Sequence, residues 1–131
     1  MALARFVLIF TGLSFFGYAI ACFIYPVEVV GRFTGYGLDA AAGLVEARAM
    51  YGGLQAGFGL FCLLAGFRRE WTQAALTAIA LVMGGLVLAR SAAMGLHGVV
   101  GAHPGAAIYE GITTALALLA LTRLPRQRGD L

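Results

Sequence analysis

Charged side chains are scarce in this sequence, and lysine is absent. Only 11% of the 131 residues are charged and 61% are hydrophobic, whereas an ordinary soluble domain is about one quarter charged. The composition therefore excludes an ordinary soluble domain, and the length allows one domain. The net charge of +3 comes from arginine alone. Most of these arginines lie at the ends of apolar runs, where they set membrane topology, so they do not indicate nucleic-acid binding.

Cysteine and histidine are also rare. Cys22 and Cys62 fall near opposite ends of their apolar runs, about 20 Å apart in depth, and a disulfide needs Cα atoms within about 7 Å. We therefore predict no disulfide. His97 and His103 are interpreted as interfacial residues, because they lack the tight helical spacing of strong metal motifs. We predict no metal site and no cofactor.

Long apolar runs dominate the chain, and a membrane-spanning helix needs about 20 mostly apolar residues. The pattern predicts an all-α, transmembrane four-helix bundle in a single domain over residues 1–131, with spans at about 3–25, 40–67, 72–96 and 104–124. Pro26 should end the first span, Asp39 should cap the second, and Pro104 should open the fourth. Arg68–Glu70 reads as a polar turn, followed by Trp71 as an interface anchor.

The arginines also predict an orientation. Arg5, Arg68–Arg69 and the tail arginines share one side of the membrane, and Arg32 lies on the other, so both termini are expected in the cytoplasm. A cleaved signal ending near Ala19–Cys22 is the alternative, but the apolar run is long for a signal and a retained span is favoured.

A short interfacial segment, Pro26–Leu38, connects the first two spans. It is interpreted as a capping loop or as a lid over the outer mouth of the bundle. Its apolar residues Val27, Val29, Val30 and Phe33 are expected at the membrane surface.

Four charged residues lie inside the spans, namely Glu46, Arg48, Arg90 and Glu110. Glu46, Arg90 and Glu110 each lie about 9–10 Å below the outer helix ends. Because a lone charge in a helix centre costs about 2.5–3.5 kcal/mol, Arg90 is expected to pair with Glu110, with Glu46 or with both. Tyr51 and Gln55 share the second span and complete the candidate polar site.

Three interpretations of this layer remain open: an ion-pair network that only locks the helices, a site for a small ligand or lipid head group, and proton or ion translocation. Translocation is the weakest, because the inner half holds no acidic or basic residue. Small residues that are candidates for helix packing are Gly52, Gly53, Gly57 and Gly111. They serve either the bundle itself or homo-oligomerisation.

The stretch Glu46-Ala-Arg48-Ala-Met-Tyr51-Gly52-Gly53-Leu-Gln55 resembles the E-x-R-x-x-Y-G-G signature of small bacterial membrane proteins grouped as Domain of Unknown Function 4345. The resemblance implies a four-helix fold, a looser kinship with DoxX-type membrane proteins and a multi-pass location in the bacterial inner membrane. It implies no catalytic residue.

The predicted function is an inner-membrane protein with a buried polar pocket in the outer-leaflet half. This pocket would bind a small amphiphile, or the protein would be an accessory subunit of a membrane complex. The alternative is an enzyme acting on a lipid-soluble substrate such as a quinone, isoprenoid or sterol-like molecule, with Glu46 or Glu110 in acid–base roles. Expected partners are membrane lipids, a small amphiphilic ligand, and a second copy or a larger membrane complex, without nucleic acid.

Overall fold

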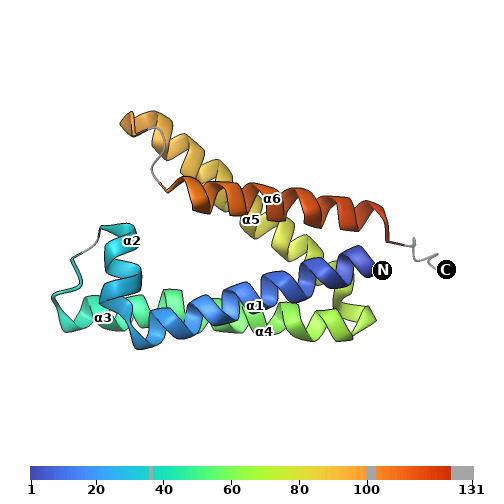
Figure 1. Cartoon of the computed structure of the whole chain (residues 1–131), viewed down its shortest axis with the longest axis horizontal. Coiled ribbons are helices and arrows are strands. Elements are labelled where there is room, and N and C mark those ends of the chain that lie inside the picture. Colours follow the sequence, from blue (N-terminus) through green and yellow to red (C-terminus); the bar gives the residue numbers. More distant parts are fainter. Residues whose placement is uncertain (36, 100–102, 125–131) are drawn as a thin grey trace. The chain divides into compact units, whose positions relative to one another are not determined.

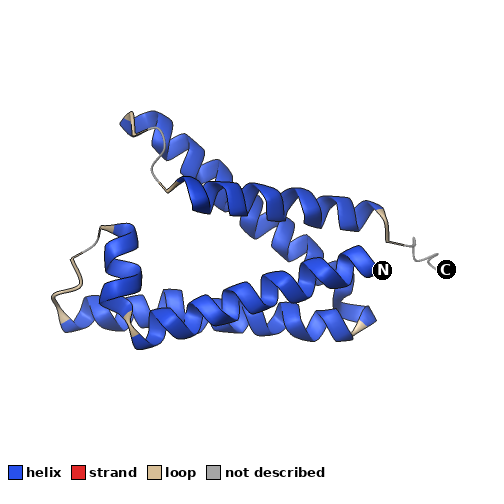
Figure 2. Cartoon of the chain, viewed as in Figure 1, coloured by secondary structure: helices blue, strands red, loops and turns tan. Residues whose placement is uncertain are grey.

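The computed structural model describes residues 1–35, 37–99 and 103–124, and these residues contain helices and connecting turns but no strand (Figure 2). The helical elements follow in the order α1 (Ala2–Ile24), η1 (Val27–Gly31), α2 (Arg32–Thr34), α3 (Ala41–Ala47), η2 (Arg48–Leu54), α4 (Gln55–Phe67), α5 (Arg69–His97) and α6 (Pro104–Thr122) (Figure 1). The elements η1 and η2 are π-helical. The chain is thus all-α, as predicted.

Four helices in the described part of the chain are long and apolar enough to cross a membrane. They are Ala2–Ile24, Ala41–Phe67, Arg69–His97 and Pro104–Thr122, and they coincide with the four predicted spans to within a few residues. The second consists of α3, η2 and α4 in direct succession.

The helix ends follow the local chemistry, with two corrections to the sequence prediction. Pro26 follows the end of α1, and Pro104 is the first residue of α6 after a left-handed His103, both as predicted. Asp39 is not the cap of the second span, because α3 begins at Ala41 and the extended Ala40 is its N-cap, with no side-chain cap. Asp39 lies one residue too early to reach the first free N–H groups of the helix.

The predicted turn Arg68–Glu70 is shorter than expected. Only Arg68 is outside a helix, with φ −113° and ψ 108°, and the residues after it form the first turn of α5. Glu70 suits this place, because a helix N-terminus favours negative charge. The Arg68 guanidinium lies over the ring of Trp71 at 5.2 Å, and the Thr72 hydroxyl donates to the carbonyl oxygens of Ala65 at 3.3 Å and Arg68 at 3.4 Å.

The chain divides into two compact units, and the first contains residues 9–64. Here α1 and α4 pack closely: a Cβ atom on Gly59 would lie 2.8 Å from the backbone nitrogen of Phe16, and one on Gly12 would lie 2.9 Å from the Gly59 carbonyl oxygen. Phe15 and Phe58 meet edge to face, with centroids 5.1 Å apart. These two glycines therefore set the closest approach of the helices.

The interfacial segment packs into this first unit. Val30 of η1 is buried with Cys22 of α1 and Ala47 of α3, and both cysteines of the chain are free and buried. Val27 and Phe33 are exposed. Val30 thus does not lie at the membrane surface as expected, because the π-helical turn of η1 directs it into the core. The segment caps the end of α1.

The second unit contains residues 1–8 and 65–131, and its described part is dominated by α5 and α6, which lie side by side (Figure 1). Leu76, Ile79 and Met83 of α5 are fully or almost fully buried. A Cβ atom on Gly84 would be in ordinary contact, 3.5 Å from the Thr114 side chain. Only Gly84 of the Gly84–Gly85 pair faces α6, because Gly85 has no neighbour within 4 Å, and α5 continues through the pair as one helix.

The glycines predicted to pack helices differ in their surroundings. A Cβ atom on Gly52 would lie 3.1 Å from the Phe23 side chain, whereas one on Gly57 or Gly111 would have no neighbour within 4 Å, and one on Gly53 would meet only the Arg48 carbonyl oxygen at 3.9 Å. Within their own units the GxxxG pair Gly53 and Gly57 and the α6 glycine Gly111 make no close helix contact. A packing role for these three positions remains a prediction.

Candidate functional site

The α5–α6 unit brings two of the predicted charged residues together. Arg90 lies seven residues before the end of α5, and Glu110 lies six residues after the start of α6. Because the helices are antiparallel neighbours joined by a short connection, residues at similar distances from that connection meet. Arg90 Nε donates to Glu110 Oε2 at 2.9 Å, and Arg90 Nη2 donates to Glu110 Oε1 at 2.6 Å. Charge-assisted bidentate pairs of this kind are the strongest and most directional of side-chain contacts.

The two partners differ in exposure. The Glu110 side chain is 6% exposed and the Arg90 side chain 23%. Breaking a buried pair by removing one partner typically costs about 3–5 kcal/mol, because the other charge is left uncompensated. The surroundings on α6 are polar as well: Thr113, three residues after Glu110, is buried, and the Thr114 hydroxyl donates to the Glu110 carbonyl oxygen at 2.7 Å.

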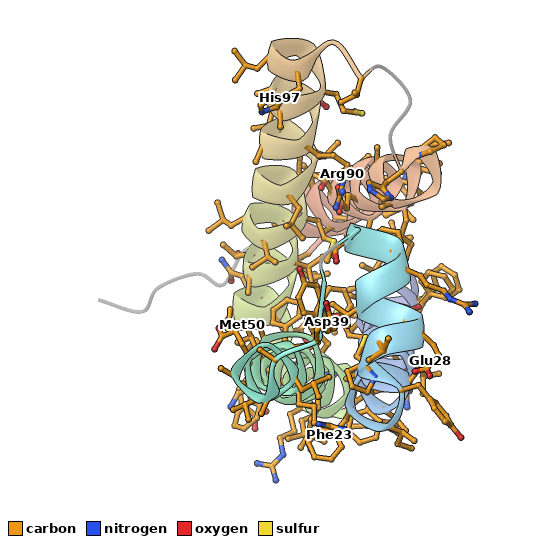
Figure 3. All side chains as sticks on the ribbon, turned by 90° about the vertical axis from the view of Figure 1, so that its left-hand side faces the viewer. Phe23, Glu28, Asp39, Met50, Arg90 and His97 are labelled. Carbon is orange, nitrogen blue, oxygen red and sulfur yellow. The ribbon has the colours of Figure 1, made fainter. Side chains whose placement is uncertain are left out.

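Arg48, in the other unit, makes a different kind of contact from Arg90. Arg48 opens η2, and its Nε donates to the backbone carbonyl oxygen of Phe23 at 3.0 Å. Its guanidinium also lies over the Phe23 ring, 6.0 Å from the centroid, and Phe23 is labelled in Figure 3. Phe23 belongs to the last turn of α1, where carbonyl groups have no partner within the helix. Arg48 thus supplies the missing donor and a positive charge at the negative end of α1.

Two further motif residues serve the same contact. Gly52 lies four residues after Arg48 and lets the Phe23 side chain approach the backbone of η2. Tyr51 is half-buried against the cluster of Cys22, Val30 and Ala47. Arg48, Tyr51 and Gly52 therefore attach the end of α1 and the interfacial segment to the second span.

The remaining candidates occupy different environments. Glu46 is exposed on α3, and Gln55 is half-buried at the start of α4. The predicted pairing of Glu46 with Arg90 remains a prediction. The described residues contain no group of three or more His, Cys, Asp or Glu side chains arranged to hold a metal ion.

Sequence reasoning missed two features of these sites. The partner of Arg48 is a backbone carbonyl, which leaves no trace in the residue pattern. Gly12, which faces Gly59, is one of two glycines on α1, and the other, Gly17, has no neighbour within 4 Å. Glycine inside an apolar run was the available signal, because glycine weakens a helix unless it permits a close approach.

The family comparison agrees with the motif. A family model described as Domain of unknown function (DUF4345) matches residues 3–124. The chain belongs to the DUF4345 family. No curated protein and no solved structure matches it. In this DUF4345 protein the segment Glu46–Gln55, which carried the resemblance, includes all of η2, and π-helical turns are frequent at functional sites.

Proposed function

We propose that this DUF4345 protein is a multi-pass protein of the bacterial inner membrane that binds a small amphiphile. In this proposal the four spans form one bundle and one domain, with both termini in the cytoplasm, and the family is related to DoxX-type proteins. The four long apolar helices support the membrane location. The distribution of the arginines along the sequence supports the orientation.

The observation that carries the binding proposal is the bidentate pair between the half-buried Arg90 and the buried Glu110. Ionised residues within spans are rare and commonly mark functional sites. Apolar side chains in place of a buried ion pair often give equal or greater stability. Helix packing alone therefore explains the presence of this ion pair poorly. Binding of a polar head group between two apolar helices explains it well.

The neighbouring side chains suit the apolar part of such a ligand. Leu86 and Met94 lie one turn before and one turn after Arg90 on the same face of α5; Leu86 is exposed and Met94 is half-buried. The polar head would meet the ion pair while the hydrocarbon chain contacts these residues. Three polar residues of the second span are proposed as further contributors to this binding site, because they lie in the same span as the charged layer: Glu46, Tyr51 and Gln55.

A second candidate function is an enzyme acting on a lipid-soluble substrate. The ion pair with Arg90 already engages Glu110, so acid–base chemistry would fall to Glu46, whose side chain is exposed on α3. Loss of turnover in Glu46→Gln with retention of the amphiphile would favour this candidate. An accessory-subunit role instead predicts that a second polypeptide co-purifies.

Native mass spectrometry of the protein extracted with its own lipids tests the binding proposal. We expect wild type to carry a co-purifying amphiphile that is lost from the double variant Arg90→Gln/Glu110→Gln. Removing both charges leaves neither one unpaired, so this variant should fold. Arg69→Gln, at the exposed opposite end of α5, is the matched control and should retain the amphiphile. A folded double variant with the same bound mass as wild type would exclude this site.

A further inference from the structure

The start of α1 and the turn between α4 and α5 carry two arginines that each lie over an aromatic ring. The guanidinium carbon of Arg5 lies 5.2 Å from the centroid of the Phe67 ring, and that of Arg68 lies 5.2 Å from the centroid of the Trp71 ring. Both contacts belong to the unit that contains α5 and α6 (Figure 1). Because Phe67 and Arg68 are consecutive residues, the two contacts form one surface region, which we call the arginine–aromatic patch.

The ring contacts hold these guanidinium groups without occupying their strong hydrogen-bond donors. A guanidinium has five N–H donors in a planar fork and stacks on aromatic faces, and a ring is a weaker acceptor than an oxygen atom. Glu110 accepts two hydrogen bonds from Arg90. By contrast, no carboxylate or carbonyl oxygen among the described residues accepts a hydrogen bond from the side chain of Arg5 or Arg68. The patch therefore presents donors to an anion from outside the chain.

This region also combines an excess of positive charge with exposed apolar surface. Residues 1–8 and 65–77 contain three arginines and one glutamate, and all four are exposed: Arg5, Arg68, Arg69 and Glu70. The rings of Phe67 and Trp71 are exposed as well. Arg68 separates two of the long apolar helices, so the patch lies at the ends of these spans, where arginine and aromatic residues meet lipid head groups.

We infer that the arginine–aromatic patch binds the head group of an anionic phospholipid. Guanidinium groups bind phosphate oxygens in pairs, and each basic residue near an anionic membrane surface contributes about fivefold in affinity. The exposed rings beside the cations suit the apolar part of a lipid, which a free phosphate lacks. The inference is independent of the proposed function, because α5 separates the patch from Arg90 by about 30 Å.

Two phospholipids with the same dioleoyl chains test the charge of the head group. Phosphatidylglycerol is anionic, whereas in phosphatidylcholine a quaternary ammonium group balances the phosphate. Titration of the full-length protein in detergent, measured by native mass spectrometry, should give tighter binding of phosphatidylglycerol by about tenfold or more, because two arginines contribute. Inorganic phosphate should fail to displace this lipid, because it cannot bury the apolar surface of the rings.

Single variants separate the patch from positive charge in general. Arg5→Gln and Arg68→Gln should each weaken the preference for phosphatidylglycerol about fivefold. Arg32→Gln removes the same charge from an exposed position on α2 in the other unit and should match wild type. Phe67→Leu keeps every charge but removes the ring beneath Arg5, and should weaken the preference about two- to fivefold. Because all these side chains are exposed, melting temperatures close to that of wild type should verify that the variants fold.

Several results would contradict the patch as a lipid site. Equal affinity for the two lipids, or an equal loss in Arg32→Gln, would show that the patch does not recognise an anionic head group. An unchanged preference in Phe67→Leu would show that charge acts without the ring. Displacement by inorganic phosphate would indicate a site for soluble anions. The double variant Arg90→Gln/Glu110→Gln should keep the lipid preference even if the proposed amphiphile site fails, and its loss there would place the lipid at Arg90 instead.

Discussion

At the residue scale, two arginines within the spans have different tasks. Arg90 neutralises a buried carboxylate, whereas Arg48 donates to a backbone carbonyl at the end of α1 and covers an aromatic ring. In a bilayer an unsatisfied carbonyl group costs several kcal/mol, on the order of the whole hydrogen bond, because no water is at hand to bind it. The arginine of the motif is therefore explained by helix docking, and its role as a direct ligand contact is not required.

Replacing Arg48 with lysine tests this role. Lysine keeps the charge but lacks the planar fork and the Nε–H donor, so Arg48→Lys should lose the bond to the Phe23 carbonyl oxygen. We expect a loss of about 1–2 kcal/mol of unfolding free energy, measured by thermal unfolding of the purified protein in detergent. Arg69→Lys, at an exposed position on α5, is the control. Equal melting temperatures for the two variants would contradict the docking role.

At the element scale, close backbone contacts rather than glycine motifs determine how α1 meets α4. The GxxxG pair Gly53 and Gly57 has open space around it within its unit, whereas Gly59 faces Gly12 and Phe16 at distances that exclude a methyl group. A GxxxG pattern indicates that one face of a helix carries small residues. It does not state which face meets a neighbour, and the π-helical η2 shifts that register further.

Alanine at two glycines of α4 should have opposite effects. A Cβ atom on Gly59 would lie 2.8 Å from the backbone nitrogen of Phe16, and a backbone atom cannot move aside as a flexible side chain can. Gly59→Ala should therefore destabilise the protein by about 1–3 kcal/mol, the usual cost of overpacking. Gly57→Ala has room and should be neutral or stabilising by up to about 1 kcal/mol through helix propensity. Denaturant titration in detergent would compare the two, and an equal loss in both would show that the α1–α4 contact is misassigned.

At the scale of the whole molecule, the sequence predicts most of the fold and one half of the candidate site. Hydropathy predicts the four spans because length and composition alone decide whether a helix can cross a membrane. It predicts the meeting of Arg90 and Glu110 because both lie at similar distances from one connection. The π-helical turns, the docking of Arg48 on a backbone carbonyl and the inward position of Val30 escape such reasoning. They depend on local register and on tertiary partners, which a pattern with a period of 3.6 residues does not contain.

The orientation in the membrane is the remaining prediction at this scale. Arginines near the ends of short loops determine the orientation of a membrane protein, because they cross the membrane least readily. This rule predicts that the turn at Arg68 and Arg69 lies in the cytoplasm and that Pro26–Leu38 lies outside. Gly37→Cys should therefore react with a membrane-impermeant maleimide in intact bacterial spheroplasts, and Glu70→Cys should react only after permeabilisation. Both positions are exposed, while Cys22 and Cys62 are buried, so wild type provides a low background. Labelling of Glu70→Cys but not of Gly37→Cys in intact spheroplasts would reverse the orientation, and with it the leaflet in which Arg90 and Glu110 lie.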